Sequence, residues 1–391
     1  MKEGWEYKKL GEVCNVIGGG TPDTKNKEYW RGNIPWATVS DMNCDVIKTT
    51  GYYITDRGLN ESSSRIIKKG EIVIATRVGL GKVCKLAVDT AINQDLKGVI
   101  PKDNNIVRDF IFYYFKHKAK YIVDNGIGAT VKGVKIKFIE GLSFGFPSLS
   151  EQQSIVDYLD AAFAKIDTMK ANAEKALNEA KALFQVSLKE MLEPKEGWEE
   201  KKLSEVVNIL NGYAFPSKAF GDNQELKVVK ITNVGVGSFI EDISTLPQKM
   251  FIQDVCLKEG DIVIALTRTI ISEGLKRAII PSSYDGAMLN QRVASLRFSG
   301  KINMSFLYYY LGCSIVSDYV WLHVNTLMQP NLSIKDLKSM PVCIPSLPEQ
   351  QSIVATLDSL KSKVDRLQAN YDKISQECDA LKQAILRQVF E

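Results

Sequence analysis

Two stretches of the chain carry apolar residues at alternating steps of four and three, which is the pattern of a coiled-coil seam. In the second stretch the pattern begins at Ile353 and continues without a break to Ile385. Its positions are Ile353, Leu357, Leu360, Val364, Leu367, Tyr371, Ile374, Cys378, Leu381 and Ile385. Uninterrupted seams of this length are uncommon in globular helices, so the pattern predicts a long helix that packs on a partner helix.

The first stretch is related to the second by an internal repeat. The decapeptide at 147–156 returns at 345–354 with a single change, Ser150 to Pro348, at an offset of 198 residues. Each of these two residues is expected at the N-cap or first turn of its helix, and Pro194 with Gly197 is expected to end the first helix. The same offset places the first seam at Ile155, Leu159, Ala162, Ile166, Met169, Ala173, Ala176, Ala180 and Leu183. Four of these positions are alanines, so bulky residues of the second helix match small residues of the first.

The repeat extends beyond the helices. Gly4-Trp5-Glu6 returns as Gly197-Trp198-Glu199, and Asn93-Gln94 returns as Asn290-Gln291. Short β-branched runs at Glu71–Ala75, Leu226–Thr232 and Asp261–Leu266 predict strands, whereas Phe110–Lys118 and Ser305–Leu311 predict helices with aromatic faces. The chain therefore reads as a tandem duplication of the α+β class, with heads at 1–146 and 195–344 and long helices at 147–194 and 345–391.

Connectivity predicts how the two helices pair. The first helix joins the two heads and the second begins at the second head, so a helix that packs on the first must run back along it. We therefore expect two similar heads joined by an antiparallel coiled coil with a pseudo-two-fold axis, and a C-terminus that returns near the N-terminus. The expected pairs are Ala173 with Leu367, Ala176 with Val364, Ala180 with Leu360 and Met169 with Tyr371.

Composition narrows the class of protein. A chain of 391 residues with 45% hydrophobic and 25% charged residues is typical of a globular protein of two or more domains. It has no apolar run long enough to span a membrane, and its first residues do not resemble a signal peptide. Seven scattered cysteines without a Cys-x-x-Cys pair indicate reduced thiols and a cytoplasmic location. A net charge of +4 excludes a polybasic coat that binds nucleic acid indiscriminately.

Two similar but non-identical heads suit an elongated ligand with two separated sites, and B-DNA is the leading candidate. Basic side chains would contact phosphates, while Arg, Asn and Gln can recognise base edges. For any single lysine a solvated surface is the more common role, and a loop amide often bonds only to backbone. The candidate DNA-contacting residues are Arg65, Lys68, Lys69, Arg77, Lys82, Asn93, Gln94, Arg268, Lys276, Asn290, Gln291 and Arg292.

Evidence for an enzyme site is weak. The only histidines, His117 and His323, belong to no recognisable motif, and the glycine-rich stretches match neither a dinucleotide fingerprint nor a Walker A loop. The paired tyrosines Tyr113-Tyr114 and Tyr308-Tyr309 are expected in the core rather than as platforms for base stacking.

The combination of motifs resembles the specificity (S) subunit of a type I restriction–modification enzyme. The resemblance rests on the two Gly-Trp-Glu starts, the paired Asn-Gln sites, the segment from Ser62-Ser63 to Gly70, and the Glu-Gln-Gln motif before each helix. It also rests on Gly19-Gly20-Thr21-Pro22, Tyr29-Trp30 and Ile34-Pro35-Trp36. The second head departs from this pattern, because Gly212-Tyr213-Ala214-Phe215 replaces the Gly-Thr-Pro loop and no Ile-Pro-Trp follows.

The resemblance implies a non-catalytic, DNA-binding subunit whose heads are target-recognition domains for the two halves of an asymmetric site. It implies two modification (methyltransferase) subunits docked on the helical regions, together with restriction subunits. S-adenosylmethionine, ATP and Mg would be bound by those partners, and this chain would hold no cofactor or metal of its own. The alternatives are a stand-alone enzyme and a coiled-coil scaffold without DNA specificity. The seam residues predicted for helix pairing and partner contact are Ile155, Leu159, Ile166, Met169, Ala173, Leu357, Val364, Leu367, Tyr371 and Ile374.

Overall fold

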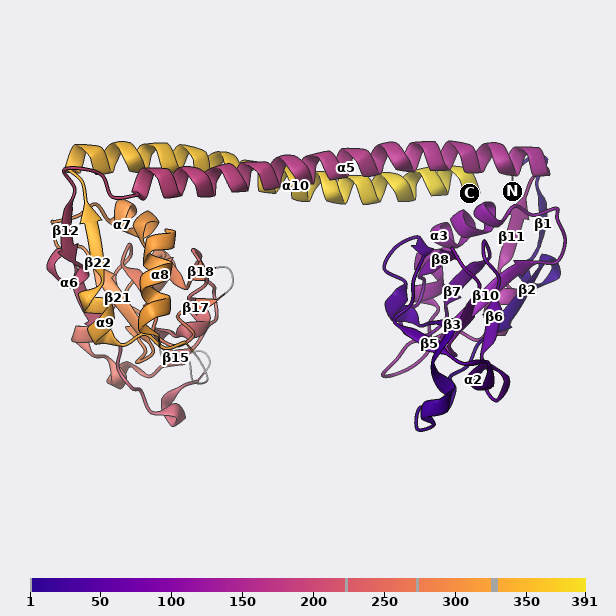
Figure 1. Cartoon of the computed structure of the whole chain (residues 1–391), viewed down its shortest axis with the longest axis horizontal. Helices are drawn as coiled ribbons and strands as arrows, with labels where there is room; N and C mark the ends of the chain where they lie inside the picture. The colour runs from indigo at the N-terminus through magenta and orange to yellow at the C-terminus, as the bar shows by residue number, and fades with distance from the viewer. Residues whose placement is uncertain (1, 222–223, 272–273, 325–329) are drawn as a thin grey trace. The chain divides into compact units, whose positions relative to one another are not determined.

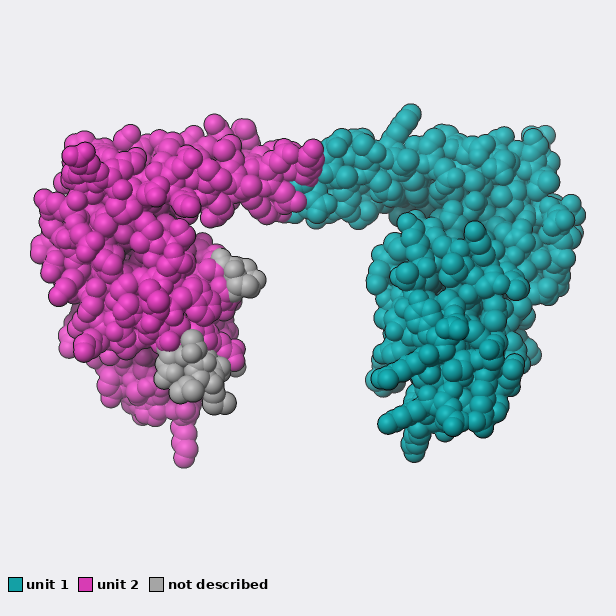
Figure 2. Space-filling view, in the orientation of Figure 1, with its two compact units in different colours: residues 1–174, 371–391 teal, residues 175–370 magenta. Residues whose placement is uncertain are grey.

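The computed structural model describes residues 2–221, 224–271, 274–324 and 330–391. The chain separates into two compact units, which Figure 2 colours differently. Unit 1 comprises residues 1–174 and 371–391, and unit 2 comprises residues 175–370. Each unit therefore contains one head and a part of both long helices. None of the helices in the described ranges is long and apolar enough to cross a membrane.

The two long helices are α5 (Leu149–Leu192) and α10 (Leu347–Phe390), each of 44 residues (Figure 1). This confirms the prediction of two long helices. Ser150 and Pro348 lie in the first turns, and the Ser148 hydroxyl accepts the Glu151 N–H at 3.4 Å. Ser148 is thus the residue that caps α5.

Within each unit the helices run antiparallel. In unit 1, Lys382 contacts Asp167 at 2.5 Å, and Lys170 contacts Asp379 at 3.5 Å. Residue numbers therefore increase along α5 in the direction in which they decrease along α10. The Cys378 thiol lies 3.8 Å from the backbone oxygen of Ile166. The expected pairing would have placed Ile374 there, so the helices are displaced by about one turn from it.

The seam of α5 differs from the prediction at three of its nine positions, because Met169, Ala176 and Leu183 are exposed. Met169 is 60% exposed and Leu183 is 59% exposed, so assigning them to the seam was wrong. Leu177 and Phe184 face inward in place of their exposed neighbours, because a larger apolar side chain gains more from burial. Phe163 is half-buried beside Ala162. In α10 the seam holds as far as Cys378, after which Leu381 is exposed. Of the residues predicted for helix pairing and partner contact, those found buried or half-buried are Ile155, Leu159, Ile166, Ala173, Leu357, Val364, Leu367, Tyr371 and Ile374.

The head of unit 1 is built on two main sheets. The five-stranded sheet has the order β2 (Cys14–Gly18), β10 (Leu96–Pro101), β7 (Ile72–Ala75), β8 (Val83–Leu86) and β4 (Val46–Ile47). The four-stranded sheet has the order β5 (Tyr52–Ile54), β3 (Trp30–Ala37), β9 (Thr90–Ile92) and β6 (Arg65–Ile67). A two-stranded ribbon pairs β1 (Glu6–Lys9) with β11 (Ser143–Phe146) just before α5. The helices are α1 (Leu10–Val13), α2 (Asp56–Asn60), α3 (Arg108–Asp124) and α4 (Ile136–Glu140).

The head of unit 2 repeats this plan. Its main sheet has the order β13 (Asn208–Asn211), β21 (Val293–Arg297), β16 (Ile262–Ala265) and β19 (Arg277–Ile279), and a second sheet has β15 (Thr245–Leu246), β14 (Leu226–Val229) and β20 (Met288–Leu289). Two ribbons pair β17 (Ile270–Ile271) with β18 (Gly274–Leu275) and β12 (Glu199–Lys202) with β22 (Pro341–Ile344). The helices are α6 (Leu203–Val206), α7 (Met304–Tyr310), α8 (Ser314–His323) and α9 (Ile334–Ser339). In both heads the second sheet contains one parallel pair, β3 with β9 and β14 with β20, so the sequence duplication is also a duplication of topology.

Both long helices complete the core of each head. In unit 1, Leu159 of α5 and Leu386 of α10 pack with Phe110 of α3, and the ring of Trp5 lies 5.8 Å from that of Phe110. Lys2 donates to the backbone oxygen of Val389 at 2.6 Å, so the two ends of the sequence lie together, as predicted.

The same contacts recur in unit 2. Trp198 packs on Phe306 at 6.1 Å, in a core that includes Leu192 of α5 and Leu357 of α10. The Tyr309 hydroxyl donates to Asp358 at 2.6 Å, and burial raises the pKa of Tyr309. This tyrosine and its counterpart Tyr113 in unit 1 belong to the core and join the heads to the long helices.

The Glu-Gln-Gln repeat has a structural explanation. The side chain of Gln152 is fully buried, donates to Pro147 O at 2.9 Å and accepts the Val107 N–H at 2.9 Å. In unit 2, Gln350 donates to Pro345 O at 2.9 Å and accepts the Asn303 N–H at 2.8 Å. Val107 and Asn303 are the residues that precede α3 and α7. One buried glutamine per head therefore ties the start of a long helix to the start of a core helix.

Candidate nucleic-acid interface

Three loops of unit 1 converge at the end of its two main sheets. They follow β2, precede β6 and connect β9 to β10. The Gly20 N–H donates to Ile92 O at 3.0 Å. A Cβ atom at Gly19 would lie 2.1 Å from Ile92 O, and one at Gly20 would lie 2.0 Å from the Ser63 hydroxyl. Only glycine fits at these two positions, which explains the Gly-Gly sequence.

The two amides of the Asn-Gln pair in unit 1 have different roles. Asn93 is only 6% exposed, and its side-chain oxygen accepts the N–H groups of Asp95 at 3.1 Å and Leu96 at 3.2 Å. This residue shapes the turn, so its side chain is not presented to a ligand. Gln94 is exposed, and its side-chain oxygen accepts the hydroxyl of Thr21. Gln94 is therefore the amide of this pair that can contact DNA.

Two of the predicted basic residues lie at the same edge as Gln94. Arg77 follows β7, and its guanidinium lies 3.8 Å from the carboxylate of Asp95, the neighbour of Gln94. The Arg77 side chain is 59% exposed. Lys82 is exposed in the same turn between β7 and β8, where its N–H donates to Gly79 O at 3.1 Å. Arg77, Lys82 and Gln94 form one surface, which we call the unit 1 edge.

The β6 strand separates the remaining basic candidates of unit 1. Exposed Arg65 stands opposite Ile92, beside the Asn-Gln turn, and joins the unit 1 edge. Lys68 and Lys69 follow the other end of β6, where the side chain of Lys68 and the N–H of Lys69 bond to Asp89 at 2.7 and 2.8 Å. The structure therefore does not bring these two lysines together with Gln94.

Unit 2 assembles a corresponding surface, the unit 2 edge. The Gln291 N–H donates to Tyr213 O at 2.9 Å, and Arg292 O accepts the Leu266 N–H at 2.8 Å. A Cβ atom at Gly212 would lie 2.0 Å from Asn290 O, the same close approach that Gly19 makes in unit 1. Asn290 is half-buried, whereas Gln291 and Arg292 are exposed.

The charge of the unit 2 edge is positive. Arg268 follows β16 and adopts a left-handed backbone with φ of 49°. Burial, followed by the nearby charge of Arg268, lowers the pKa of Lys276. Arg268, Lys276 and Arg292 form no ion pair with a carboxylate in the described part of the chain. Uncompensated cations next to an exposed amide are the composition expected of a surface that contacts DNA.

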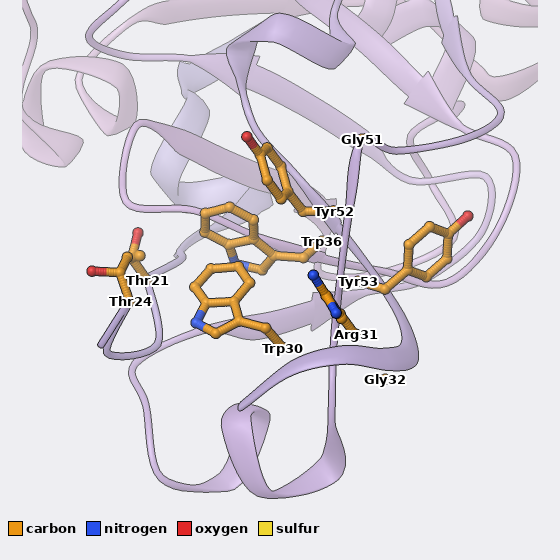
Figure 3. Close-up of a pocket in the computed structure, with 9 residues that line it drawn as sticks. All are labelled: Thr21, Thr24, Trp30, Arg31, Gly32, Trp36, Gly51, Tyr52 and Tyr53. Carbon is orange, nitrogen blue, oxygen red and sulfur yellow. The ribbon is translucent and has the colours of Figure 1, made fainter. Parts of the chain in front are cut away.

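Sequence reasoning missed an aromatic cavity beside the unit 1 edge. Its volume is about 770 Å³, and Figure 3 shows the side chains around it. The ring of Trp30 lies 5.1 Å from that of Trp36, and both lie about 6 Å from Tyr52. The signal was present in the Tyr-Trp and Ile-Pro-Trp motifs. The lining residues used below are Thr21, Trp30, Arg31, Trp36, Tyr52 and Tyr53.

The histidines are parts of helical packing. The side chain of His117 is 4% exposed and stacks on Phe390 at 5.5 Å, and burial lowers its pKa to about 4. His323 stacks on Tyr319 at 4.0 Å in α8. Over the described ranges no three metal-ligating side chains gather into a possible metal site.

The model of the type I restriction modification DNA specificity domain matches residues 2–179 and 195–376. The chain belongs to this family. The type I restriction enzyme MjaIX specificity subunit of Methanocaldococcus jannaschii is 27% identical, with 96% of this chain and 91% of the relative aligned. The MjaVIII specificity subunit of the same organism is 29% identical over 93% of this chain and 88% of the relative.

Solved structures share the fold of this specificity-domain protein. A chain from a structural study of complex assembly in a type I R-M system aligns over 100% of this chain and 98% of its own length, with a TM-score of 0.79 and 20% identity. The HsdS subunit of Thermoanaerobacter tengcongensis aligns over 100% and 97%, with a TM-score of 0.58 and 20% identity. Membership of the specificity family implies DNA sequence recognition, and subunits of this family are generally non-catalytic.

Proposed function

We propose that this chain is the sequence-specific DNA-binding subunit of a type I restriction–modification complex and that each unit reads one half of a bipartite, asymmetric site. One observation carries the proposal. The repeat places an exposed arginine and an exposed glutamine at equivalent edges, Arg77 with Gln94 in unit 1 and Arg268 with Gln291 in unit 2. An arginine can bond in bidentate fashion to guanine, and a glutamine can do so to adenine.

The neighbours of these residues differ between the units, which supports recognition of two different half-sites. In unit 1 the glutamine contacts Thr21 beside the aromatic cavity. In unit 2 the backbone of Gln291 bonds to Tyr213, which is 49% exposed and packs on Phe215 at 5.1 Å. Surfaces with different hydrogen-bonding groups and shapes select different base pairs, so the composite target would lack two-fold symmetry.

Partners would supply the chemistry. We propose that two modification subunits dock on the long helices and methylate an adenine in each half-site, and that restriction subunits join them to cut DNA. S-adenosylmethionine, ATP and Mg would be bound by those subunits, in the cytoplasm. The helices would fix the number of unread bases between the half-sites.

Exchange of one head tests the division of labour. Residues 1–146 are replaced by the first head of another specificity subunit, and the methylated motif is mapped in cells that carry the modification partners. Only one half of the motif should change. The reciprocal exchange of residues 195–344 is the matched control and should change only the other half. A change in both halves after either exchange would contradict independent recognition.

Direct binding tests the DNA role itself. The chain assembled with its modification subunits should bind DNA that carries the mapped motif, with an affinity that falls steeply as salt rises, because bound cations release counterions from the phosphates. Equal affinity for DNA with and without the motif at every salt concentration would contradict sequence recognition and favour the scaffold alternative.

A further inference from the structure

The walls of the aromatic cavity in unit 1 are held in place before anything binds. The indole N–H of Trp36 donates to Gly20 O at 3.1 Å, and that of Trp30 donates to Asp23 O at 3.1 Å. The two rings meet edge to face with an interplanar angle of 89°. Because both polar indole groups already bond to the protein, the rings offer the cavity carbon surfaces in a fixed geometry.

Polar groups without partners lie at the mouth of the cavity. Arg31 lies in the irregular part of β3, between Trp30 and Ile34, where the pairing with β5 shifts register. Its φ of 64° is left-handed, a strained conformation for a residue with a Cβ atom. The irregularity re-aims the arginine toward the cavity, as β-bulges do beside functional sites (Figure 3).

Arg31 and the neighbouring tyrosines are free to contact a ligand. Among the described residues, the guanidinium of Arg31 and the hydroxyls of Tyr52 and Tyr53 form no hydrogen bond or ion pair within the protein. Tyr52 is 56% exposed and Tyr53 is 39% exposed. The cavity thus combines aromatic walls with one unpaired cation and the unpaired hydroxyl of Tyr52, which suits a planar ligand with an anionic group attached.

The cavity is continuous with the unit 1 edge. Thr21 lines the cavity, and its hydroxyl contacts the side chain of Gln94. Gly20, the neighbour of Thr21, holds Trp36 through its carbonyl oxygen. The loop that positions the exposed amide therefore also positions the aromatic wall, so DNA that contacts Gln94 brings its bases to the cavity.

A base inside a duplex cannot stack on these aromatic side chains, because both faces of the base are covered by the neighbouring bases. A base that has left the stack exposes a face that aromatic side chains can contact, and stacking of this kind tolerates any base. We infer that the cavity of unit 1 binds one nucleobase displaced from the stack of the bound DNA, with Arg31 on the adjoining phosphate or base edge. This inference rests on the proposed function and assigns the cavity a role within it.

Removal of single bases tests the inference. The full chain is assembled with its modification subunits, and affinity is measured by fluorescence anisotropy on DNA that carries the mapped motif. A series of DNAs each lacks one base in or beside the half-site read by unit 1. Trp30→Ala and Tyr52→Ala should each weaken binding to intact DNA by roughly 5- to 150-fold, the range for loss of one base–aromatic stack.

The decisive result is non-additivity at one position. One of the abasic DNAs should bind the wild-type complex more weakly by about the same factor, and the two substitutions should weaken its binding no further. If the effects of substitution and base removal add at every position, the cavity does not hold a base. Unchanged binding of intact DNA by both variants would also overturn the inference while leaving the proposed function intact.

Matched variants separate stacking from folding. Trp321, which is 51% exposed on α8 of unit 2, serves as a control, and Trp321→Ala should keep full affinity. Trp30→Phe should retain most of the affinity, because it keeps an aromatic face. Tyr52 is exposed enough that its truncation should leave the melting temperature unchanged. If the wild-type complex shows no salt-dependent, motif-specific binding, the proposed function fails and this inference fails with it.

Discussion

Replacing Gln152, the buried glutamine near the start of α5, should destabilise unit 1 selectively. In Gln152→Ala the Val107 N–H loses its acceptor at 2.9 Å and Pro147 O loses its donor at 2.9 Å. The side chain is fully buried, so water cannot replace these bonds without opening the core. An unsatisfied buried group costs about 1–3 kcal/mol, so two such groups predict a loss of about 2–6 kcal/mol.

The neighbouring residue provides a matched control. Gln153 is exposed on the same turn of α5, and its side chain donates to the exposed carboxylate of Asp157 at 2.9 Å, so Gln153→Ala should change stability by less than about 0.5 kcal/mol. Because a chain with two units need not unfold in one step, hydrogen exchange should be read at individual amides along with urea unfolding. Exchange should accelerate at the Val107 amide and the first turn of α5, while the equivalent amides around Gln350 stay protected. Equal stability of Gln152→Ala and Gln153→Ala would refute the reasoning.

Three further outcomes are expected. Because folding lowers the pKa of His117 from its ordinary 6.5 to about 4, the unfolded chain takes up a proton first as pH falls. Stability should therefore decline between about pH 6.5 and 4 by on the order of 3 kcal/mol, and urea unfolding of His117→Phe should show a flatter pH profile. Arg77→Ala and Arg268→Ala should each weaken DNA binding by about 1–3 kcal/mol. Lys68→Ala is the control, because Lys68 lies away from the unit 1 edge, and it should not weaken binding. Equal affinities of all three variants at matched salt would contradict this assignment. Four residues inserted in α5 add about 6 Å of helix and should lengthen the gap in the methylated motif by one or two base pairs. The insertion also shifts the seam register, and activity is lost if the two helices unwind from each other. A helical, active variant that keeps the original gap would show that the helices do not set the distance.

The repeat made the architecture predictable. The strands expected from Glu71 and Asp261 appear as β7 and β16, and the helix expected at Phe110–Lys118 appears within α3. These elements follow from local patterns of apolar residues. The seam of α5 was partly misassigned because Ala176 and Leu177 both fit an apolar pattern, and a transferred offset cannot tell which of the two neighbours gains more by burial.

The site was predictable only in part. Arg77 and Gln94 stand at strand ends that the main sheet brings to one edge, and the strand pattern was visible in the sequence. The inward orientation of Asn93 depends on the turn it closes, which no pattern of polar residues indicated. The aromatic cavity depends on pairing between β3 and β5, which sets Trp36 opposite Tyr52. Such non-local pairing is fixed by the tertiary fold.

The division of both long helices between the units has a consequence for the order of folding. Unit 1 needs Leu386 and Phe390 to close its core, yet roughly 200 residues of unit 2 are synthesised between Glu174 and Tyr371. At typical rates of translation, about 10–40 s pass between the synthesis of Glu174 and that of Tyr371. During this time the aromatic face of α3 lacks the side chains that cover it in the folded protein. Unit 2 occupies one continuous segment of the chain, so it can complete its folding before unit 1 even though its synthesis begins later.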